Sequence, residues 1–247
     1  MPHFFISSND IQGKTALITG PLAHHLKGPL RMKSGERIHL VDEKMRGYHV
    51  VLKDIGRSDI SGEVIGEDEA RVSDTAVTLA QAIIKGKRMD LIVQKATELG
   101  IMEIIPIISE RSVVRPTPSS GIKDMRRWQI IAEEASQQSE RWDIPSVRAP
   151  LSFSEYLDSP DPFDIAIILW EGERKKPMKE ILKKGGRRIG LLVGPEGGFS
   201  DTEVDTACKK GFIPVTLGQG ILRSETAAIA AISITQYELG RLGSVQG

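Results

Sequence analysis

The chain has 247 residues, and its 33 Lys and Arg residues balance 33 Asp and Glu residues, so the formal net charge is zero. With 40% hydrophobic and 27% charged residues, the composition excludes a mainly disordered chain, and the length allows one large domain or two small ones. The sequence contains neither the ~18-residue apolar stretch of a membrane span nor a secretory signal. The single cysteine, Cys208, cannot form an internal disulfide. We therefore expect a cytoplasmic protein with no membrane partner.

Residues 1–72 contain short segments that have the composition of β-strands and are separated by turn signals. These segments are FFIS, ALIT, ERIHLVD, YHVVLKDI and ISGEVIGED. Only 22–32 resembles a helix, and its Gly28-Pro29 pair is expected to break that helix. Several short strands within about 70 residues predict a small β-barrel.

Strands and helices alternate from residue 75 onward, which predicts an α/β domain with a largely parallel sheet and helices on both faces. We place the domain boundary between 72 and 73, which gives domains 1–72 and 73–247. Ser200 and Glu203 have capping-box spacing at the start of a helix. The expected strands are 78–84, 101–108, 163–170, 188–194 and 212–218, and the expected helices are 87–100, 122–139, 177–184, one beginning at Ser200 and one capped by Ser224.

Two glycine-rich loops each follow an expected strand and precede an expected helix. The first is Gly194-Pro195-Glu196-Gly197-Gly198, and the second runs from Leu217 to Ala227. Ligands of open α/β sheets bind beyond the carboxyl ends of the strands, where glycine lets the backbone approach a ligand closely. The first loop matches neither the dinucleotide fingerprint nor the phosphate loop. An ordinary turn is the alternative for each loop, and the presence of two in one sheet favours a ligand site.

Other candidates for chemistry are weak. His24-His25 lies in no HExxH pattern and has no cysteine cluster beside it, so we expect no metal site. Cys208 shares helical spacing with Val204 and Ala207, which predicts a core position rather than a nucleophile. No GxSxG hydrolase elbow is present.

The net charge excludes a polybasic protein that binds nucleic acid by bulk charge, but it allows a local basic face. Basic residues cluster in 110–127, with Arg111, Arg115, Lys123, Arg126 and Arg127, and in 174–188. Solvated surface is the ordinary explanation for either cluster. Trp128 and Trp142 have the ring systems to stack on bases, although burial on a helix face is the commoner role.

The strings LLVGPEGGFSDTEV and LGQGILRSETAAIAAI resemble the signature of the RsmE family of ribosomal RNA methyltransferases. KGKRMDLIVQKATELGIMEIIPI and RRWQIIAEEASQQSERWDIP resemble two further family segments, and HHLKGPLRMKSGERIHLVD resembles the family's N-terminal pattern. The resemblance thus covers nearly the whole chain. This sequence departs from the family pattern at His3, where members usually carry arginine, and at Pro29, where they usually carry valine.

The resemblance implies an α/β fold in which a PUA-like β-barrel precedes a SPOUT domain with a C-terminal trefoil knot. It implies a homodimer that methylates N3 of a uridine in 16S ribosomal RNA, within the small ribosomal subunit, with S-adenosyl-L-methionine as the donor. It also implies that three loops hold the donor. The residues of these loops are Leu169, Trp170, Glu171, Gly172, Gly194, Pro195, Glu196, Gly197, Gly198, Leu217, Gly218, Ile221, Leu222, Arg223 and Thr226.

Uracil N3 carries a proton at neutral pH, so a site for this reaction must remove that proton or stabilise the resulting anion. The charged fork of an arginine suits the second task, and a carboxylate can perform the first. Arg223 and Glu225 are therefore the catalytic candidates, although Glu225 has two other possible roles, orienting Arg223 or capping the helix. Two alternative functions stay open: a SPOUT methyltransferase acting on another RNA or on a ribose oxygen, and a non-catalytic RNA-binding dimer.

Overall fold

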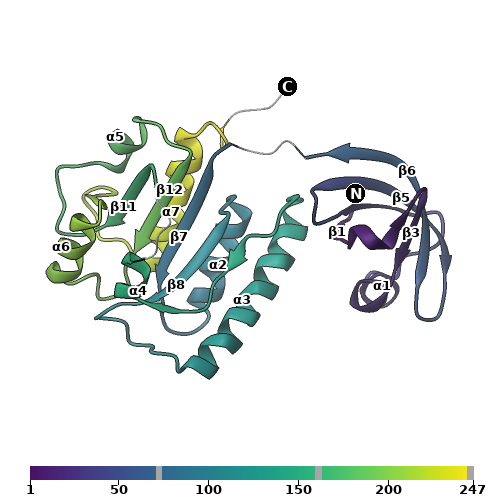
Figure 1. Cartoon of the computed structure of the whole chain (residues 1–247), viewed down its shortest axis with the longest axis horizontal. Helices are drawn as coiled ribbons and strands as arrows, with labels where there is room; N and C mark the ends of the chain where they lie inside the picture. The colour runs from purple at the N-terminus through teal and green to yellow at the C-terminus, as the bar shows by residue number, and fades with distance from the viewer. Residues whose placement is uncertain (71–73, 159–162, 244–247) are drawn as a thin grey trace. The chain divides into compact units, whose positions relative to one another are not determined.

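The computed structural model describes residues 1–70, 74–158 and 163–243 and divides into two compact units (Figure 1). The N-terminal unit comprises Met1–Val72 and Ser136–Asp143, and the C-terminal unit comprises Ser73–Ala135 and Ile144–Gly247. A segment from the middle of the chain thus belongs to the N-terminal unit. The expected boundary between 72 and 73 lies outside the described residues. No helix in the described part of the chain has the length and apolar character needed to cross a membrane.

The described residues of the N-terminal unit form a six-stranded sheet, one complete α-helix and the end of a second helix. Its strand order is β1-β4-β5-β6-β3-β2; β1 and β4 are parallel, and the other neighbours are antiparallel. Within the described residues β1 and β2 end this sheet, so the closed barrel expected from the sequence is not found. The elements are β1 (His3–Phe5), a short 3-10 helix (Ser8–Asp10), β2 (Ile11–Gln12), β3 (Thr15–Ile18), α1 (Gly20–Lys27), β4 (Arg37–Val41), β5 (Arg46–Ile55) and β6 (Ile60–Glu69).

Alternation along β4 separates the two faces of the N-terminal sheet. Ile38 and Leu40 are buried in the apolar core of this unit, so His39 lies on the opposite face. Trp142, from Ser136–Asp143, packs edge-on against His39 with the ring centroids 5.1 Å apart. Burial lowers the pKa of His3 and the pKa of His39, so both imidazoles are neutral at neutral pH.

The C-terminal unit is built on a parallel sheet of order β10-β8-β7-β12-β11-β13, with β9 beside β8. The prediction of a parallel α/β domain is confirmed. The elements are β7 (Ala76–Ala82), α2 (Arg88–Glu98), β8 (Glu103–Ile108), α3 (Pro118–Gln138), β9 (Ser146–Val147), β10 (Leu151–Ser152), α4 (Phe153–Leu157), β11 (Ile165–Leu169), α5 (Met178–Leu182), β12 (Arg188–Val193), α6 (Asp201–Lys209), β13 (Ile213–Val215) and α7 (Ser224–Glu238).

Each face of the parallel sheet is covered by helices, as the sequence predicted (Figure 1). Residues of α2, α3, α5 and α7 form one apolar core with the sheet, and residues of α4 and α6 form another. Trp128 of α3 is buried in the first core and donates a hydrogen bond to Asp90 Oδ1 (3.1 Å). This burial removes Trp128 from the surface on which a base could stack.

The expectation that Cys208 is a core residue is wrong. Val204 and Ala207 of α6 are buried, but Cys208 is exposed. The apolar stripe of α6 is narrow, and the position after Ala207 lies beyond its edge. The capping box that opens α6 is present as predicted, because Ser200 Oγ accepts from Glu203 N–H while the Glu203 carboxylate accepts from Ser200 N–H.

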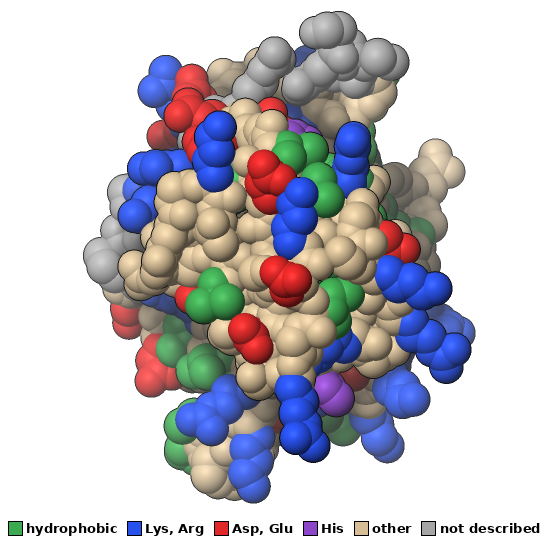
Figure 2. Space-filling model, turned by 90° about the vertical axis from the view of Figure 1, so that its right-hand side faces the viewer, with side chains coloured by type: hydrophobic (Ala, Val, Ile, Leu, Met, Phe, Trp, Pro, Cys, Tyr) green, Lys and Arg blue, Asp and Glu red, His purple; other side chains and the backbone are tan. Residues whose placement is uncertain are grey.

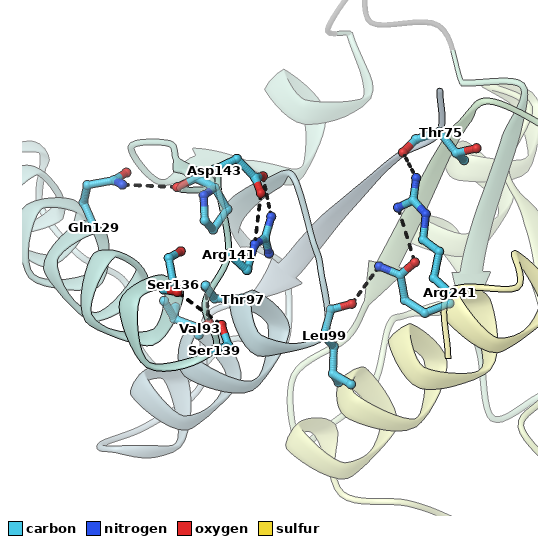
Figure 3. Close-up of polar contacts among 12 residues, drawn as sticks. Thr75, Val93, Thr97, Leu99, Gln129, Ser136, Ser139, Arg141, Asp143 and Arg241 are labelled. Atoms are coloured by element: carbon cyan, nitrogen blue, oxygen red, sulfur yellow. Dashed lines mark hydrogen bonds and ion pairs between the residues drawn. The ribbon is translucent and has the colours of Figure 1, made fainter. Parts of the chain in front are cut away.

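A polar chain fixes the C-terminal end of α7 (Figure 3). Gln236 Nε2 donates to the carbonyl oxygen of Leu99 (2.7 Å), and Arg241 Nη1 donates to Gln236 Oε1 (3.4 Å). Arg241 also donates to the carbonyl oxygen of Thr75. These contacts join the C-terminal end of α7 to the end of α2 and to the residue before β7. The N-terminal end of α7 lies at the loops described next.

Candidate functional site

A cavity of about 910 Å³ opens at the carboxyl ends of β11, β12 and β13. Its size is that of a small-molecule site, ~300–1,000 Å³, and its position is the usual ligand position of an open parallel sheet. The lining residues come from three loops and the start of α7. They are Leu169, Trp170, Glu171, Gly172, Glu173, Arg174, Val193, Gly194, Pro195, Glu196, Gly198, Phe199, Val215, Thr216, Leu217, Gly218, Gln219, Gly220, Ile221, Leu222, Ser224 and Ala227.

The first loop leaves β11 at Trp170, which holds the loop beside β13. Trp170 N–H donates to the carbonyl oxygen of Val215 (3.2 Å). The Trp170 indole folds back over Gly172, where a Cβ atom would lie only 2.4 Å from the ring. Position 172 therefore requires glycine if the indole is to keep its place in the cavity wall.

The second loop leaves β12 and forms a tight turn that also requires glycine. Gly198 N–H donates to the carbonyl oxygen of Pro195 (3.0 Å), and Gly198 has a φ of +67°. A Cβ atom at position 198 would lie 3.1 Å from the Glu171 carboxylate. A side chain at Gly198 would thus strain the backbone and press on the first loop.

Residues outside the cavity brace the second loop. Arg88 pairs with Glu196 at 2.6 Å, and Arg111 Nη1 donates to the carbonyl oxygen of Gly197 (3.0 Å). A Cβ atom at Gly197 would meet Arg111, 3.4 Å away, and Gly197 is absent from the cavity lining. Gly197 therefore lies on the side of the turn that contacts Arg111 and not on the side that lines the cavity.

The third loop, Thr216 to Arg223, begins with a compact side-chain turn. Thr216 Oγ1 accepts from Gly218 N–H (3.1 Å) and donates to the carbonyl oxygen of Gly218 (2.9 Å). Gly218 has a φ of +137°, with open space where a Cβ atom would stand. Ile221 and Leu222 follow with 87% and 41% of their surfaces exposed, which gives the cavity an apolar rim.

A buried polar junction that the sequence analysis missed joins two of the loops. Ser224 Oγ donates to the carbonyl oxygen of Gly194 (2.5 Å), and Gln81 Nε2 donates to Ser224 Oγ (3.0 Å) and to the carbonyl oxygen of Ala82 (2.9 Å). The expectation that Ser224 caps α7 is wrong. Arg223 occupies the N-cap position, and Ser224 is the first residue of the helix. Gln81 is the only polar residue in the apolar run 79–84, which is a signal that could have marked it.

The structure brings nearly all of the predicted donor residues to this one cavity. Gly197, Arg223 and Thr226 are the exceptions, because they do not line it. Arg223 and Thr226 are both exposed at the start of α7. The lining residues missing from the sequence prediction lie within or next to the three loops: Glu173, Arg174, Val193, Phe199, Val215, Thr216, Gln219, Gly220, Ser224 and Ala227.

Arg223 and Glu225 lie at the same helix end but in different environments. Arg223 is exposed, whereas only 9% of the Glu225 surface is exposed and its Oε2 accepts no hydrogen bond from any described residue. Residues two apart on a helix do not face each other. A buried carboxylate oxygen without a partner is energetically costly, and Glu225, like Arg223, does not line the cavity.

The two basic clusters differ in how far their charges are already paired. In 110–127, Arg111 and Arg115 donate to backbone carbonyl oxygens, and Arg127 pairs with Asp90 at 2.7 Å. In 174–188, Arg174, Lys175 and Lys176 are exposed, and Arg174 lines the cavity. The face shown in Figure 2 carries side chains of both charges, and Lys and Arg side chains gather toward its lower edge.

Comparisons with known proteins identify the family. Residues 71–236 match the model of the RNA methyltransferase domain. The chain is 31% identical to ribosomal RNA small subunit methyltransferase E of Bacillus subtilis, over 96% of this chain and 97% of that protein. It is 33% identical to the corresponding protein of Mesomycoplasma hyopneumoniae, over 93% and 96%.

Solved structures agree with the sequence comparisons. Ribosomal RNA small subunit methyltransferase E of Neisseria gonorrhoeae, bound to S-adenosyl methionine, superposes with a TM-score of 0.85 at 34% identity, over 96% of this chain and 97% of that one. The resemblance drawn from GPEGG and ILR-ET is thereby confirmed. The chain belongs to the RNA methyltransferase family, in the RsmE group of ribosomal RNA small subunit methyltransferases.

Proposed function

We propose that this protein transfers a methyl group from S-adenosyl-L-methionine to N3 of a uridine in 16S ribosomal RNA, in the cytoplasm and within the small ribosomal subunit. The observation that carries the proposal is the cavity at the ends of β11, β12 and β13. A relative with 34% identity over nearly the whole chain is bound to S-adenosyl methionine. A pure RNA-binding module has no need of such a cavity.

The cavity suits the proposed donor. The loops after β11, β12 and β13 offer backbone groups to the polar edges of an adenine and of an amino acid, and Gly198 and Gly218 leave no side chain in the way. Leu217, Ile221 and Leu222 supply the apolar walls that an adenine ring needs. When bound, S-adenosylmethionine supplies an electrophilic methyl group on its sulfonium.

The start of α7 provides the two groups that the uracil requires. Glu225 Oε2, buried and without a partner among the described residues, accepts the proton from N3. Arg223, exposed at the N-cap, stabilises the negative charge that spreads onto the uracil carbonyl oxygens, because its planar fork can donate to two acceptors at once. Ser224 lies between them in the chain and lines the cavity, so both groups are next to a residue of the cavity wall. The burial and missing partner of Glu225 favour the base role over the orienting role.

The proposal includes a homodimer. The middle of α7, residues 227–232, is apolar all round, and such helical stretches are normally buried. A second cavity of about 580 Å³ runs along α7 and shares Thr216, Leu217 and Gly218 with the donor cavity. Tyr237 lines it with 63% of its surface exposed. A second copy seated on this surface would bury Tyr237 and stabilise the third loop.

Two finer features of the fold belong to the proposal as well. The sheet order β7-β12-β11-β13 places β13 at the edge, and α7 returns from that edge to pack beside α2 and β12. This return supports a C-terminal trefoil knot. The mixed sheet of the N-terminal unit, with one strand pair parallel and the others antiparallel, supports a PUA-like RNA-binding unit.

Donor binding and methyl transfer test the proposal on the full chain. Calorimetry is expected to find one S-adenosylmethionine per chain, and incubation with unmethylated small subunits is expected to yield 3-methyluridine. A failure to bind the donor would support the non-catalytic RNA-binding dimer. Donor binding with methyl groups found only in another RNA, or on a ribose oxygen, would leave the donor site in place and overturn the substrate assignment.

A further inference from the structure

Three histidines form a row across neighbouring strands of the N-terminal sheet. His3 of β1 pairs in register with His39 of β4, and His39 pairs in register with His49 of β5. Residues directly opposite each other on adjacent strands have Cβ atoms ~4.5–5.5 Å apart. Asp68, on the next strand β6, completes the row, because its carboxylate lies beside the His49 imidazole. Four strands thus bring these side chains to one place.

The ligand atoms of His39, His49 and Asp68 are close enough to share one cation. One ligand atom from each of the three residues lies within 4.8 Å of the other two. Asp68 Oδ2 is 2.5 Å from His49 Nε2 and 3.8 Å from His39 Nε2. Nitrogen and oxygen ligands ~2.0–2.2 Å from a tetrahedral zinc ion lie roughly 3.3 Å apart. The two observed distances lie on either side of this value, so a small side-chain adjustment suffices.

An ion pair between His49 and Asp68 explains only part of this arrangement. His39 Nε2 is buried and has no hydrogen-bond partner among the described residues. A buried polar atom without a partner is costly. A cation coordinated by His39 Nε2 removes that cost, whereas the ion pair leaves the atom unsatisfied.

Two glycines on the paired strands leave space for the imidazole rings. Gly47 lies opposite Asp68, and a Cβ atom there would come within 2.5 Å of His39 Nε2 and of the Trp142 ring. Gly66 lies opposite His49, and a Cβ atom there would be 3.4 Å from the His49 ring. Glycine at both positions leaves space for the two imidazoles and for the Trp142 ring that packs beside them.

His3 holds His39 in the orientation that coordination requires. The two Nδ1 atoms are 3.2 Å apart, so one of them donates to the other. If His39 Nδ1–H donates to His3 Nδ1, the lone pair of His39 lies on Nε2, toward Asp68. Histidine ligands commonly donate their second N–H to a neighbouring acceptor in this way.

We propose that His39, His49 and Asp68 form a zinc site, with His3 as a positioning residue and water in the fourth coordination position. Two imidazoles and one carboxylate are a ligand set suited to Zn²⁺. The ion would tie β4, β5 and β6 together and stabilise the N-terminal unit. This site lies wholly in that unit, so a test of zinc binding is independent of a test of methyl transfer.

Zinc titration of the full chain by calorimetry, with Zn²⁺ as the only added metal, tests the site. We expect one ion per chain in the wild type and a loss of affinity of at least ~100-fold in a His49→Gln/Asp68→Asn double variant, whose side chains are partly exposed and whose fold should survive. A His24→Gln/His25→Gln variant, altered at two exposed histidines of α1, should bind like the wild type. Equal affinities in the wild type and the first double variant, or no binding, would overturn the site.

Cobalt provides a spectroscopic check of geometry and of the role of His3. Bound Co²⁺ should give the intense visible absorption of a tetrahedral ion, which a loose surface complex lacks. His3→Arg introduces the residue usual in the family, and arginine cannot accept a hydrogen bond. It should weaken zinc binding by about 10–100-fold while keeping the tetrahedral spectrum. Unchanged affinity in His3→Arg would refute the positioning role.

Discussion

The two units place their polar groups in different parts of a sheet. In the C-terminal unit, the cavity lies at the ends of parallel strands, where glycine loops present backbone groups. In the N-terminal unit, histidines project from the face of a sheet, across strands. We call the cavity the strand-end site; at about 910 Å³ it can accommodate a large organic ligand. We call His3, His39, His49 and Asp68 the strand-face cluster, which has room for an ion.

In the strand-end site the start of α7 supplies the proposed catalytic side chains, and Glu225→Gln tests this most severely. If Glu225 is the base, we expect the rate of methyl transfer to fall by ~10²–10⁴-fold. Single-turnover reactions on small subunits, with donor saturating, measure the rate. A fall of less than ~10-fold would instead assign Glu225 an orienting role.

Arg223→Ala is expected to lower the same rate by about 10²–10³-fold, or about 3–4 kcal/mol, because the developing uracil anion loses its charged donor. Arg223→Lys should restore part of the rate, since lysine supplies charge without the planar fork. Donor affinity should change little, because Arg223 does not line the cavity. Arg126→Ala, at an exposed arginine of α3, serves as the control. A wild-type rate in Arg223→Ala would remove this residue from the mechanism.

A pair of adjacent glycines tests whether backbone shape forms the donor site. Gly198→Ala places a Cβ atom at a φ of +67° and 3.1 Å from Glu171, a strain worth about 1–3 kcal/mol. We expect donor affinity to fall by ~10–100-fold. Gly197→Ala, whose Cβ atom meets only Arg111 at 3.4 Å, should bind nearly as the wild type does. Calorimetry compares them, and equal affinities would contradict the backbone account.

The smallest expected effect concerns RNA. Replacing Arg174, Lys175 and Lys176 with serine should reduce the slope of log affinity against log salt by about 0.7–0.9 for each phosphate that these side chains neutralise. Replacing Lys183 and Lys184, exposed residues that follow α5 and lie outside the cavity lining, provides the control. Filter binding over a salt series gives both slopes. If only the control variant alters the slope, the RNA surface lies away from the cavity mouth.

The strand-end site was largely predictable because its parts are contiguous in the sequence. Each loop follows an apolar run, and GPEGG carries its own glycines, so strand, turn and helix could be located together. Ser200 and Glu203 marked the start of α6 three residues apart. Ser224 was misassigned because its hydroxyl has a better partner in the carbonyl oxygen of Gly194, and such a tertiary contact has no local signature.

The strand-face cluster could not be predicted, because its members lie at positions 3, 39, 49 and 68. Only the strand register brings them together, and a register shift of one residue would move each histidine to the other face. The inclusion of Ser136–Asp143 in the N-terminal unit was hidden for a similar reason. That segment continues the helical pattern of α3, and the packing of Trp142 on His39 is a long-range contact.

Mass spectrometry of nucleosides from 16S ribosomal RNA is the most direct test of the central claim. The RNA is taken from a strain that lacks this protein and from the same strain supplied with either the wild type or Arg223→Ala. We expect 3-methyluridine to be absent without the protein, restored by the wild type and strongly reduced with Arg223→Ala. An unchanged level of 3-methyluridine in the strain lacking the protein would contradict the assignment of this chain as the uridine N3 methyltransferase.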